Sequence, residues 1–422
     1  MKLLKKFLFQ NIKSAGKMGF FHLLSANLLI QITGFGGQIF LTRILDVEDI
    51  GAIKVMQSYL NVFVIIASLG LNTAVLKLCS ENNMKEEKIN TFNISFIFTI
   101  IASLVLVLLV ELCSFENMLK TNEMLNIYIL LIPFLSMTNL IVVYFQSQQN
   151  IKKMSLIQSY SKIIIVVFST LLAYFLGLKG YIYSLVVLNA ITFFIIIPFI
   201  KKEINNLFKV KFSKLQVKRI FSIGLYAFGA NLLGVLLLNI NLIVANVLIS
   251  NSKSIGYYSI AQLIISTMMM IPSTLGQIMV PKISKVSHNK EDVLNILKNY
   301  QRKNSIIAIC LAISAGITAP FIIPIVFGKD YSSAVEYFEI LLVGFVFWSL
   351  YSPKGIALMG VGRSDINFYI SMFSLTINII LSVIFMKIYG MYGAALATTI
   401  MYFFTVIVNN IFFRRMYIKN KI

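Results

Sequence analysis

Charged residues are scarce in this sequence: they make up 13% of the 422 residues, while hydrophobic residues make up 58%. A water-soluble domain normally carries about 25% charged residues and about 45–50% apolar ones. The scarcity of charge therefore excludes a chain built of soluble domains. No stretch is both long enough and polar enough to form one, and the apolar runs are long enough to cross a bilayer.

Residues that build catalytic and metal centres are also few. The three cysteines, Cys79, Cys113 and Cys310, lie far apart and lack CxxC spacing, which argues against a disulfide framework and against a metal site. The only histidines are His22 and His288, and the sequence contains no HExxH, P-loop or GxSxG signature. We therefore expect no enzymatic activity, no cofactor and no bound metal.

Acidic residues are the scarcer of the charged kinds, with 16 against 37 basic residues and a net charge of +21. Such a charge suggests a nucleic-acid partner. The basic residues, however, stand in short loops between apolar runs, where membrane topology places them. We therefore expect no nucleic-acid partner. Residues 1–17 are basic, partly amphipathic and without a cleavage site, which favours a cytoplasmic anchor on the membrane surface over a signal peptide.

Apolar runs predict about twelve transmembrane helices. With the N-terminus inside, 30 Lys and Arg residues fall in inner segments and 7 in outer ones, if Lys162 is counted with an inner loop. A bias that alternates along the chain predicts that both termini are cytoplasmic. The predicted spans are 20–42, 57–76, 92–112, 125–148, 157–177, 180–200, 221–249, 257–280, 304–326, 335–353, 366–388 and 391–413.

The two halves of the chain look duplicated. Ile50-Gly51 and Ile255-Gly256 each lead into a span at an offset of 205, and Gly177-Leu-Lys-Gly180 resembles Gly390-Met-Tyr-Gly393. Six plus six spans of the same sense form a parallel repeat, with its axis along the membrane normal and a central cavity between two pseudo-symmetric lobes. The predicted organisation is an all-α membrane protein with a basic N-tail (1–19), a six-helix lobe (20–200), a basic linker (201–220), a second six-helix lobe (221–413) and a C-tail (414–422).

Polar side chains recur along single helix faces within several predicted spans. Because polar groups are costly against lipid, these stripes are expected to face protein or water. One interpretation is hydrogen bonding between packed helices; the other, which we favour, is a hydrated cavity. The asparagines of the seventh span spread over a wide arc, so some of them are expected to pack. The cavity-lining candidates are Asn27, Gln31, Gln38, Asn61, Ser68, Asn72, Asn139, Gln146, Gln262, Ser266 and Gln277.

Ionisable residues near the membrane core are basic. No Asp or Glu falls near the middle of a predicted span, which disfavours an ion-coupled antiporter of cations, because such a protein usually needs a carboxylate at membrane depth. The basic residues are either anchors that extend to the interface or contacts for an anionic group such as a phosphate. These phosphate-contact candidates are Arg43, Lys77, Lys162, Lys282 and Lys354.

Several short motifs, in order along nearly the whole chain, resemble those of bacterial polysaccharide exporters. The resemblance is to the O-antigen and capsule repeat-unit flippases, often called Wzx-type, of the multidrug/oligosaccharidyl-lipid/polysaccharide exporter superfamily. Related lipid II flippases usually have two further C-terminal spans and an Arg-rich first span, whereas this chain has only Arg43 there. The motifs are Leu41-Thr-Arg43-Ile-Leu45, Ile50-Gly51, Leu69-Gly70-Leu71, Gly256-Tyr-Tyr-Ser-Ile-Ala261, Pro281-Lys-Ile-Ser284, Pro320-Phe-Ile-Ile-Pro324-Ile-Val-Phe-Gly328 and Gly390-Met-Tyr-Gly393-Ala-Ala395.

The resemblance implies an oligosaccharide linked through pyrophosphate to a polyprenol as the substrate. It would move from the inner to the outer leaflet of a bacterial cytoplasmic membrane by alternating access. Bilayer lipids, a polysaccharide polymerase and glycosyltransferases are the expected partners. Two alternatives stay open at this point: a small-molecule antiporter of the same fold, and a non-transporting scaffold of a polysaccharide synthesis complex.

Overall fold

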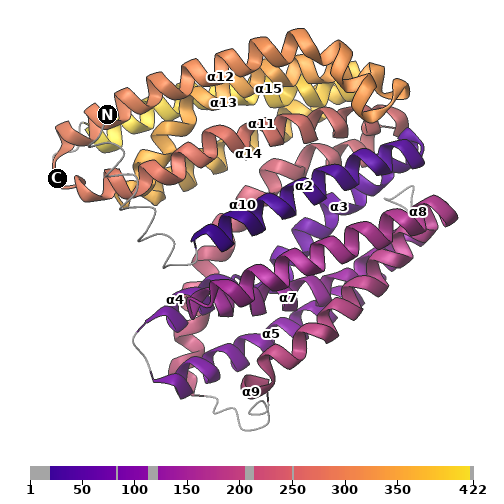
Figure 1. The fold of residues 1–422 in the computed structure, drawn as a ribbon. Helices are drawn as coiled ribbons and strands as arrows, with labels where there is room; N and C mark the ends of the chain where they lie inside the picture. The colour runs from indigo at the N-terminus through magenta and orange to yellow at the C-terminus, as the bar shows by residue number, and fades with distance from the viewer. Residues whose placement is uncertain (1–19, 82–83, 113–121, 205–212, 250, 419–422) are drawn as a thin grey trace, which may run out of the picture. The chain divides into compact units, whose positions relative to one another are not determined.

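The computed structural model describes residues 20–81, 84–112, 122–204, 213–249 and 251–418, and within these ranges every regular element is a helix (Figure 1). The predicted N-tail, part of the predicted linker and the last residues of the predicted C-tail lie outside the described residues. The all-α fold expected from the composition is confirmed.

The helices gather into two compact units. One unit takes in the chain up to Leu45 together with Leu60–Leu232, and the other takes in Asp46–Tyr59 together with Leu233–Ile422. Two helices therefore contribute residues to both units, α3 (Val47–Ser68) and α10 (Lys214–Leu248). The first unit also holds α2 (Phe20–Ile44), α4 (Leu71–Ser80), α5 (Lys85–Leu112), α6 (Asn122–Ile129), α7 (Leu131–Ser147), α8 (Ile151–Ile196), η2 (Ile197–Ile200) and α9 (Lys201–Ile204).

In the second unit, α13 packs against α11, α12 and α15, and α15 packs against α14. The bounds of its elements are α11 (Ser252–Lys285), α12 (Lys290–Phe327), η4 (Lys329–Ser333), α13 (Ala334–Gly360), α14 (Ser364–Tyr389), α15 (Met391–Phe412) and η5 (Phe413–Ile418).

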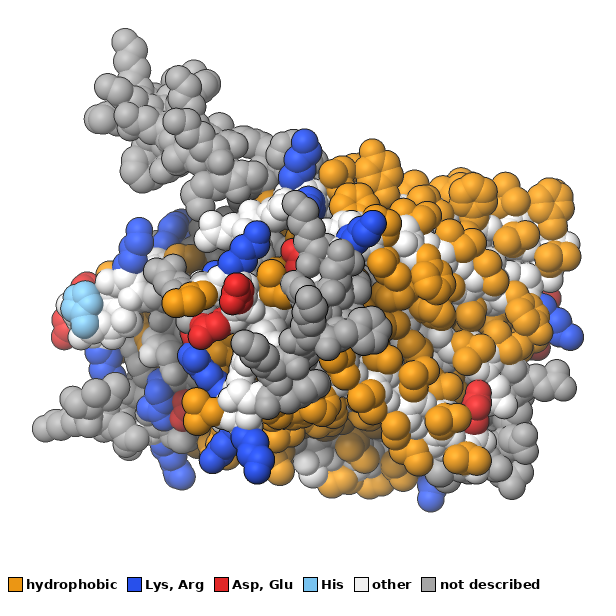
Figure 2. All heavy atoms as spheres, turned by 90° about the horizontal axis from the view of Figure 1, so that it is seen from below, with side chains coloured by type: hydrophobic (Ala, Val, Ile, Leu, Met, Phe, Trp, Pro, Cys, Tyr) orange, Lys and Arg blue, Asp and Glu red, His pale blue; other side chains and the backbone are white. Residues whose placement is uncertain are grey.

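Ten helical stretches of the described chain are long and apolar enough to cross a membrane. One of them, Ile151–Ile200, contains two predicted spans, and α2 covers the first predicted span, so the helices account for about twelve spans. On the face drawn in Figure 2, hydrophobic side chains cover a broad band, and most of the visible Lys and Arg side chains gather at one end of it. Exposed aliphatic side chains such as Ile101 and Leu108 are what a lipid-facing surface requires.

The second predicted span, 57–76, is interrupted. Helix α3 ends at Ser68 and α4 begins at Leu71, and both residues between them, Leu69 and Gly70, have positive φ angles. A Cβ atom on Gly70 would lie 2.0 Å from the carbonyl oxygen of Gly224 in α10. The break therefore lets two backbones meet within the first unit, which explains a glycine inside the Leu69-Gly70-Leu71 motif.

The two repeat-related glycines at an offset of 205 pack against each other's helices in the second unit. A Cβ atom on Gly51 would lie 2.6 Å from the Ser252 carbonyl oxygen, and one on Gly256 would lie 2.3 Å from the Val47 carbonyl oxygen. Val47 and Ser252 are themselves 205 residues apart, so the two contacts are equivalent under the repeat. The crossing of α3 and α11 therefore has local two-fold symmetry, in which each glycine leaves room for the backbone of the other helix.

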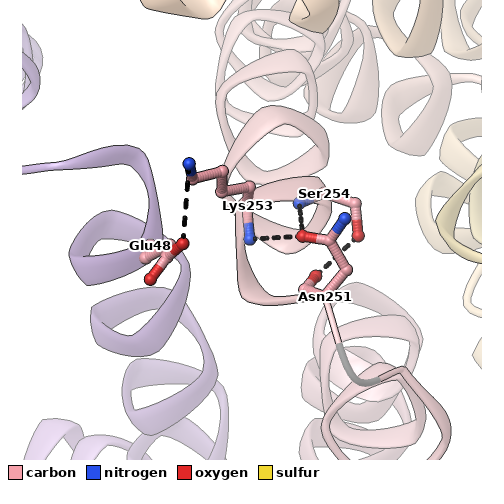
Figure 3. A network of polar contacts seen from close by, with 4 residues as sticks. All are labelled: Glu48, Asn251, Lys253 and Ser254. Carbon is pink, nitrogen blue, oxygen red and sulfur yellow. Dashed lines mark hydrogen bonds and ion pairs between the residues drawn. The ribbon is translucent and has the colours of Figure 1, made fainter.

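The same crossing carries an ion pair between repeat-equivalent residues. Figure 3 shows the Lys253 ammonium facing the Glu48 carboxylate, with an N–O distance of 3.7 Å. Asn251 fixes the start of α11, because its Oδ1 accepts hydrogen bonds from the backbone N–H groups of Lys253 and Ser254 at 3.1 and 3.4 Å. Both charged side chains are more than half exposed, so the pair adds little stability and serves mainly to match the two helix ends.

The turns between the last two spans of each half also repeat. Gly177, inside α8, has φ 63° and ψ −151°, and Gly390, between α14 and α15, has φ 60° and ψ −141°. This backbone conformation is almost confined to glycine. Three residues later, Gly180 and Gly393 lie against the backbones of Leu172 and Phe385, which correspond at the same offset of 213. The duplication predicted from these motifs is confirmed in their geometry.

The glycine crossing leads to a first prediction. Gly256→Ala places a Cβ atom inside the contact distance of the Val47 carbonyl, so α3 and α11 must separate, at a cost of about 1–3 kcal/mol. We expect a lower melting temperature of the purified protein. Gly234→Ala is the control, because nothing lies within 4 Å of a Cβ atom there, and it should leave the melting temperature equal or higher. Equal melting temperatures for wild type and Gly256→Ala would refute the close crossing.

Candidate functional site

Helices α2 and α8 pack closely in the first unit, because α2 presents glycines to α8. A Cβ atom on Gly34 would lie 3.5 Å from Cε of Lys162, and one on Gly37 would lie 2.4 Å from Cγ1 of Val166. The Lys162 side chain thus lies over the Gly34 turn of α2. The structure brings this predicted cation together with the predicted polar stripe of the first span.

Lys162 lies within the fifth predicted span, 157–177, and the length of α8 agrees with this position. A hydrocarbon core of about 30 Å takes about 20 helical residues. Helix α8 begins at Ile151 and runs unbroken to Gly177, so such a core begins by about residue 157 and Lys162 lies at least about 7 Å inside it. Gly34, beside it, is near the middle of α2. If Lys162 is counted with its span and not with the inner loop, the inner total of Lys and Arg is 29 instead of 30.

Neutral polar side chains flank the cation along α2. Gln31 and Gln38 lie three residues before and four residues after Gly34, which puts all three on one face of the helix. Gln31 is exposed and Gln38 is half-buried. Neither side chain, nor that of Lys162, hydrogen-bonds another described residue, so hydrogen bonding between packed helices does not account for them. The side chain of Asn27, on the same stripe, lies outside the described residues.

Two stripe residues of α7 are also exposed, Asn139 near the middle of the span and Gln146 near its end. Their side chains likewise make no hydrogen bond within the part of the chain that the structure describes. An amide without a partner is costly in hydrocarbon but not in water. Asn139, like Gln31, therefore favours a hydrated surface over a lipid-facing one.

Other stripe residues have protein partners. Ser68 and Ser266 donate to carbonyls of their own helices, Ile65 and Leu263, each at 2.8 Å, and Gln262 donates to the Leu238 carbonyl of α10 at 2.8 Å. Only the Gln262 contact joins two helices, and the two serine contacts lie within their own helices. Asn61 is exposed. Asn72 is half-buried, and its buried Oδ1 accepts no hydrogen bond from a described residue. The Gln277 side chain lies outside the described residues.

The remaining basic candidates lie near helix ends. Arg43, Lys77 and Lys282 are exposed in the last turns of α2, α4 and α11. Lys354 is half-buried on α13, where its ammonium donates to Asn410 Oδ1 and lies 5.9 Å from the centre of the Phe413 ring. Lys354 thus already has neighbours in the second unit, whereas Lys162 is the candidate at membrane depth that makes no hydrogen bond among the described residues.

The carboxylates of the described chain lie at helix ends or between helices. Examples are Glu48 in the first turn of α3, Glu111 in the last turn of α5 and Glu336 in the first turn of α13. A search of the described residues finds no group of three His, Cys, Asp or Glu side chains that could hold a metal ion. The cation of the α2–α8 face therefore has no membrane-embedded acid beside it in the described structure.

A buried polar network ties four helices of the second unit together. Asn241 of α10 donates to the Tyr258 hydroxyl at 3.1 Å and to Thr398 Oγ1 at 2.6 Å, while its Oδ1 accepts from Ser382 at 2.6 Å. Asn241 and Asn246 are both buried, which agrees with the expectation that some asparagines of the seventh span pack. The wide spread of those asparagines could not identify which one holds the network.

This network gives a second prediction. Asn241→Leu removes one hydrogen-bond partner each from Tyr258, Ser382 and Thr398 and leaves the amide site unfilled, so we expect a loss of about 1–3 kcal/mol and a lower melting temperature. Asn231→Leu is the matched control, because it removes the same group from an exposed position of the same helix. If both variants have the same melting temperature as wild type, the network does not stabilise the unit.

The fold is similar to that of several solved membrane transporters. It is similar to an inward-facing multidrug resistance MATE family transporter of the MOP superfamily, with a TM-score of 0.73 and 14% identity over 94% of this chain and 97% of that chain. It is similar to the lipid II flippase MurJ in an inward closed conformation, with a TM-score of 0.67 and 18% identity over 92% and 86% of the two chains. A MOP superfamily transporter from Pyrococcus furiosus gives a TM-score of 0.60 and 13% identity over 94% of both chains.

The sequence profile of one family, "Polysaccharide biosynthesis protein", matches residues 40–336. The match covers more than half of the chain, and the chain belongs to this family. The resemblance seen in the short motifs is thereby confirmed.

Two curated relatives come from Methanocaldococcus jannaschii. The uncharacterized membrane protein MJ1068 is 23% identical over 384 residues, which cover 84% of this chain and 75% of that one. The uncharacterized membrane protein MJ1375 is 33% identical over 146 residues, or 34% of each chain, so this match spans about a third of MJ1375.

Proposed function

We propose that this protein moves polyprenyl-pyrophosphate-linked oligosaccharide repeat units, of the kind used for O-antigen or capsule, from the inner to the outer leaflet of a cytoplasmic membrane. It would do so by alternating access, with both termini in the cytoplasm. The distribution of 29 inner and 7 outer Lys and Arg residues supports this orientation. Membership of the polysaccharide biosynthesis family and a transporter fold support the general activity.

The observation that carries the proposal is the α2–α8 face. Gln31 and Gln38 flank Gly34, against which Lys162 lies, and none of these three polar side chains hydrogen-bonds another described residue. A surface of neutral amides with one cation, inside the hydrophobic thickness, suits a cargo that is mostly hydroxyls with one anionic group. The pyrophosphate would meet Lys162, and the sugar would meet the amides.

The physical need for such a surface follows from the cost of dehydration. Each polar group that enters hydrocarbon without a partner costs about 1–3 kcal/mol, so a glycan of about ten hydroxyls faces a barrier on the order of 10–30 kcal/mol. Side-chain amides can replace water hydrogen bonds one for one without holding the sugar in a rigid geometry. The polyprenyl tail can stay in the bilayer meanwhile.

The membrane potential can contribute to the direction of movement. An inside-negative potential favours outward movement of an anion by about 2.3 kcal/mol per charge per 100 mV. A protonatable carboxylate at membrane depth would be the usual sign of ion coupling, and the described helices carry their carboxylates near their ends. This disfavours the alternative, a small-molecule antiporter. A polymerase and glycosyltransferases are the proposed partners, because they supply and consume the repeat unit.

The third prediction concerns the embedded cation. In a strain that lacks this gene, Lys162→Gln should restore export of the lipid-linked repeat unit at least tenfold more slowly than wild type. Lys162→Arg should restore most of the rate, because it keeps the charge that pairs with pyrophosphate. The measurement is the amount of lipid-linked glycan in each leaflet, with its mass to identify the cargo.

Lys298→Gln is the control, since it removes a charge from an exposed site on α12. Wild-type export by Lys162→Gln, at an equal protein level, would remove the role of Lys162. If the gene-deficient strain accumulates no lipid-linked glycan on its inner leaflet and keeps its surface glycan, the flippase proposal fails, and efflux assays for a small-molecule antiporter follow.

A further inference from the structure

A second polar site lies at the end of the first unit, away from the α2–α8 face. A cleft of about 400 Å³ opens among the first turns of α5 and α8, the end of α7 and α9. Lys153 lines the cleft and precedes Lys162 by nine residues on α8, which separates the two lysines by about 13 Å along the helix. The cleft is therefore a different site from the membrane-embedded one.

The cleft is basic. It is lined by Lys85, Lys88 and Lys153 and by one carboxylate, Glu203, which gives a net charge of +2. Glu203 has a neighbour of its own, because the Tyr144 hydroxyl hydrogen-bonds its side chain. None of these lysines takes part in the ion pairs Arg219–Glu81, Lys253–Glu48 and Arg363–Asp365.

The walls of the cleft are held by specific contacts. Asn150 caps α8, with its Oδ1 accepting from the Lys153 backbone N–H at 3.3 Å, and the Gln148 amide donates to the Cys79 carbonyl at 3.1 Å. The Asn93 amide donates to the Glu203 carbonyl at 3.0 Å, which ties α9 to α5. Lys153 is held in turn by the Phe145 ring, whose centre lies 5.3 Å from its ammonium.

Two helix starts add to the positive potential. Lys85 and Lys88 stand in the first turn of α5, which has 28 residues, and Lys153 stands in the first turn of α8. The first turn of α5 also carries Glu86 and Glu87, which do not line the cleft. The N-terminus of a long helix carries a partial positive charge and favours an anion. Lysine ammonium groups around such an opening form a site for phosphate oxygens.

We propose that this cleft binds a doubly charged phosphate group, either a phosphomonoester or a pyrophosphate, carried by a lipid of the leaflet at that surface. The net charge of +2 matches a dianion better than the single charge of a phosphodiester headgroup. The exposed Phe199 lies one helical turn before Glu203, so a headgroup in the cleft has an apolar surface next to it for its chains. Free pyrophosphate shares the same recognition chemistry.

The test uses purified full-length protein in nanodiscs of phosphatidylcholine, with phosphatidic acid or phosphatidylglycerol added at equal amounts. Bound lipid is counted by native mass spectrometry, and soluble inorganic pyrophosphate is titrated separately. The triple variant Lys85→Gln, Lys88→Gln, Lys153→Gln should bind phosphatidic acid at least tenfold more weakly than wild type. Wild type should prefer phosphatidic acid to phosphatidylglycerol, and the triple variant should show no such preference.

A second triple variant, Lys152→Gln, Lys201→Gln, Lys218→Gln, is the control, because it removes the same charge from exposed lysines that do not line the cleft. Equal loss in both triple variants would mean diffuse attraction to a basic surface and would overturn the proposal, as would no loss in either. Binding of pyrophosphate but not of phosphatidic acid, lost only in the cleft variant, would overturn the lipid source. Lys85→Arg, Lys88→Arg, Lys153→Arg should retain binding, which separates the role of charge from misfolding.

Discussion

In hydrocarbon, every polar group needs a partner, and this constraint organises the whole molecule. Backbone groups meet it by forming helices, which is why the described elements are helical throughout. Ser68, Ser266 and Gln262 meet it through hydrogen bonds to backbone carbonyls. Gln31 and Lys162 form no hydrogen bond with another described residue, so water or a ligand must supply their partners. The proposed function depends on that difference.

Close backbone contacts hold the frame in which this polar face sits. Glycines let α2 approach α8, let α4 approach α10, and let α3 and α11 cross at their ends. Without the hydrophobic effect between helices, small residues and van der Waals contact supply much of the association in a bilayer. The α3–α11 crossing is made by equivalent residues of the two repeats, and α3 and α10 each contribute to both units. The duplication is thus an element of the packing as well as of the topology.

The sequence predicted much of this fold because membrane helices carry strong local signals. Hydropathy and the distribution of Lys and Arg gave the class and about twelve spans, and the glycine motifs gave the repeat. The break at Leu69 and Gly70 was missed because apolar residues continue across it, and only the contact with Gly224 requires it.

The candidate site was predicted less completely. The spacing of Gln31 and Gln38 identified one helix face, but the sequence could not tell hydrogen-bonded stripe residues from unpaired ones. The predicted span 157–177 already contained Lys162, and the structure adds that α8 begins six residues before that span, at Ile151. The cleft near Lys153 was not predicted, because its lysines come from separate helices and each one, by sequence alone, is typical of a charge in a loop.

The central claim is that the α2–α8 face is hydrated at membrane depth, and thiol labelling tests it directly. Cys79, Cys113 and Cys310 would be replaced by Ala, and a single cysteine placed at Gln31 or, as the lipid-facing control, at Ile101, which is 51% exposed near the middle of α5. Maleimides react with the thiolate, which needs water to form. The account predicts rapid labelling at position 31 by a small water-soluble maleimide and almost none at position 101. Equally slow labelling at both positions would contradict it.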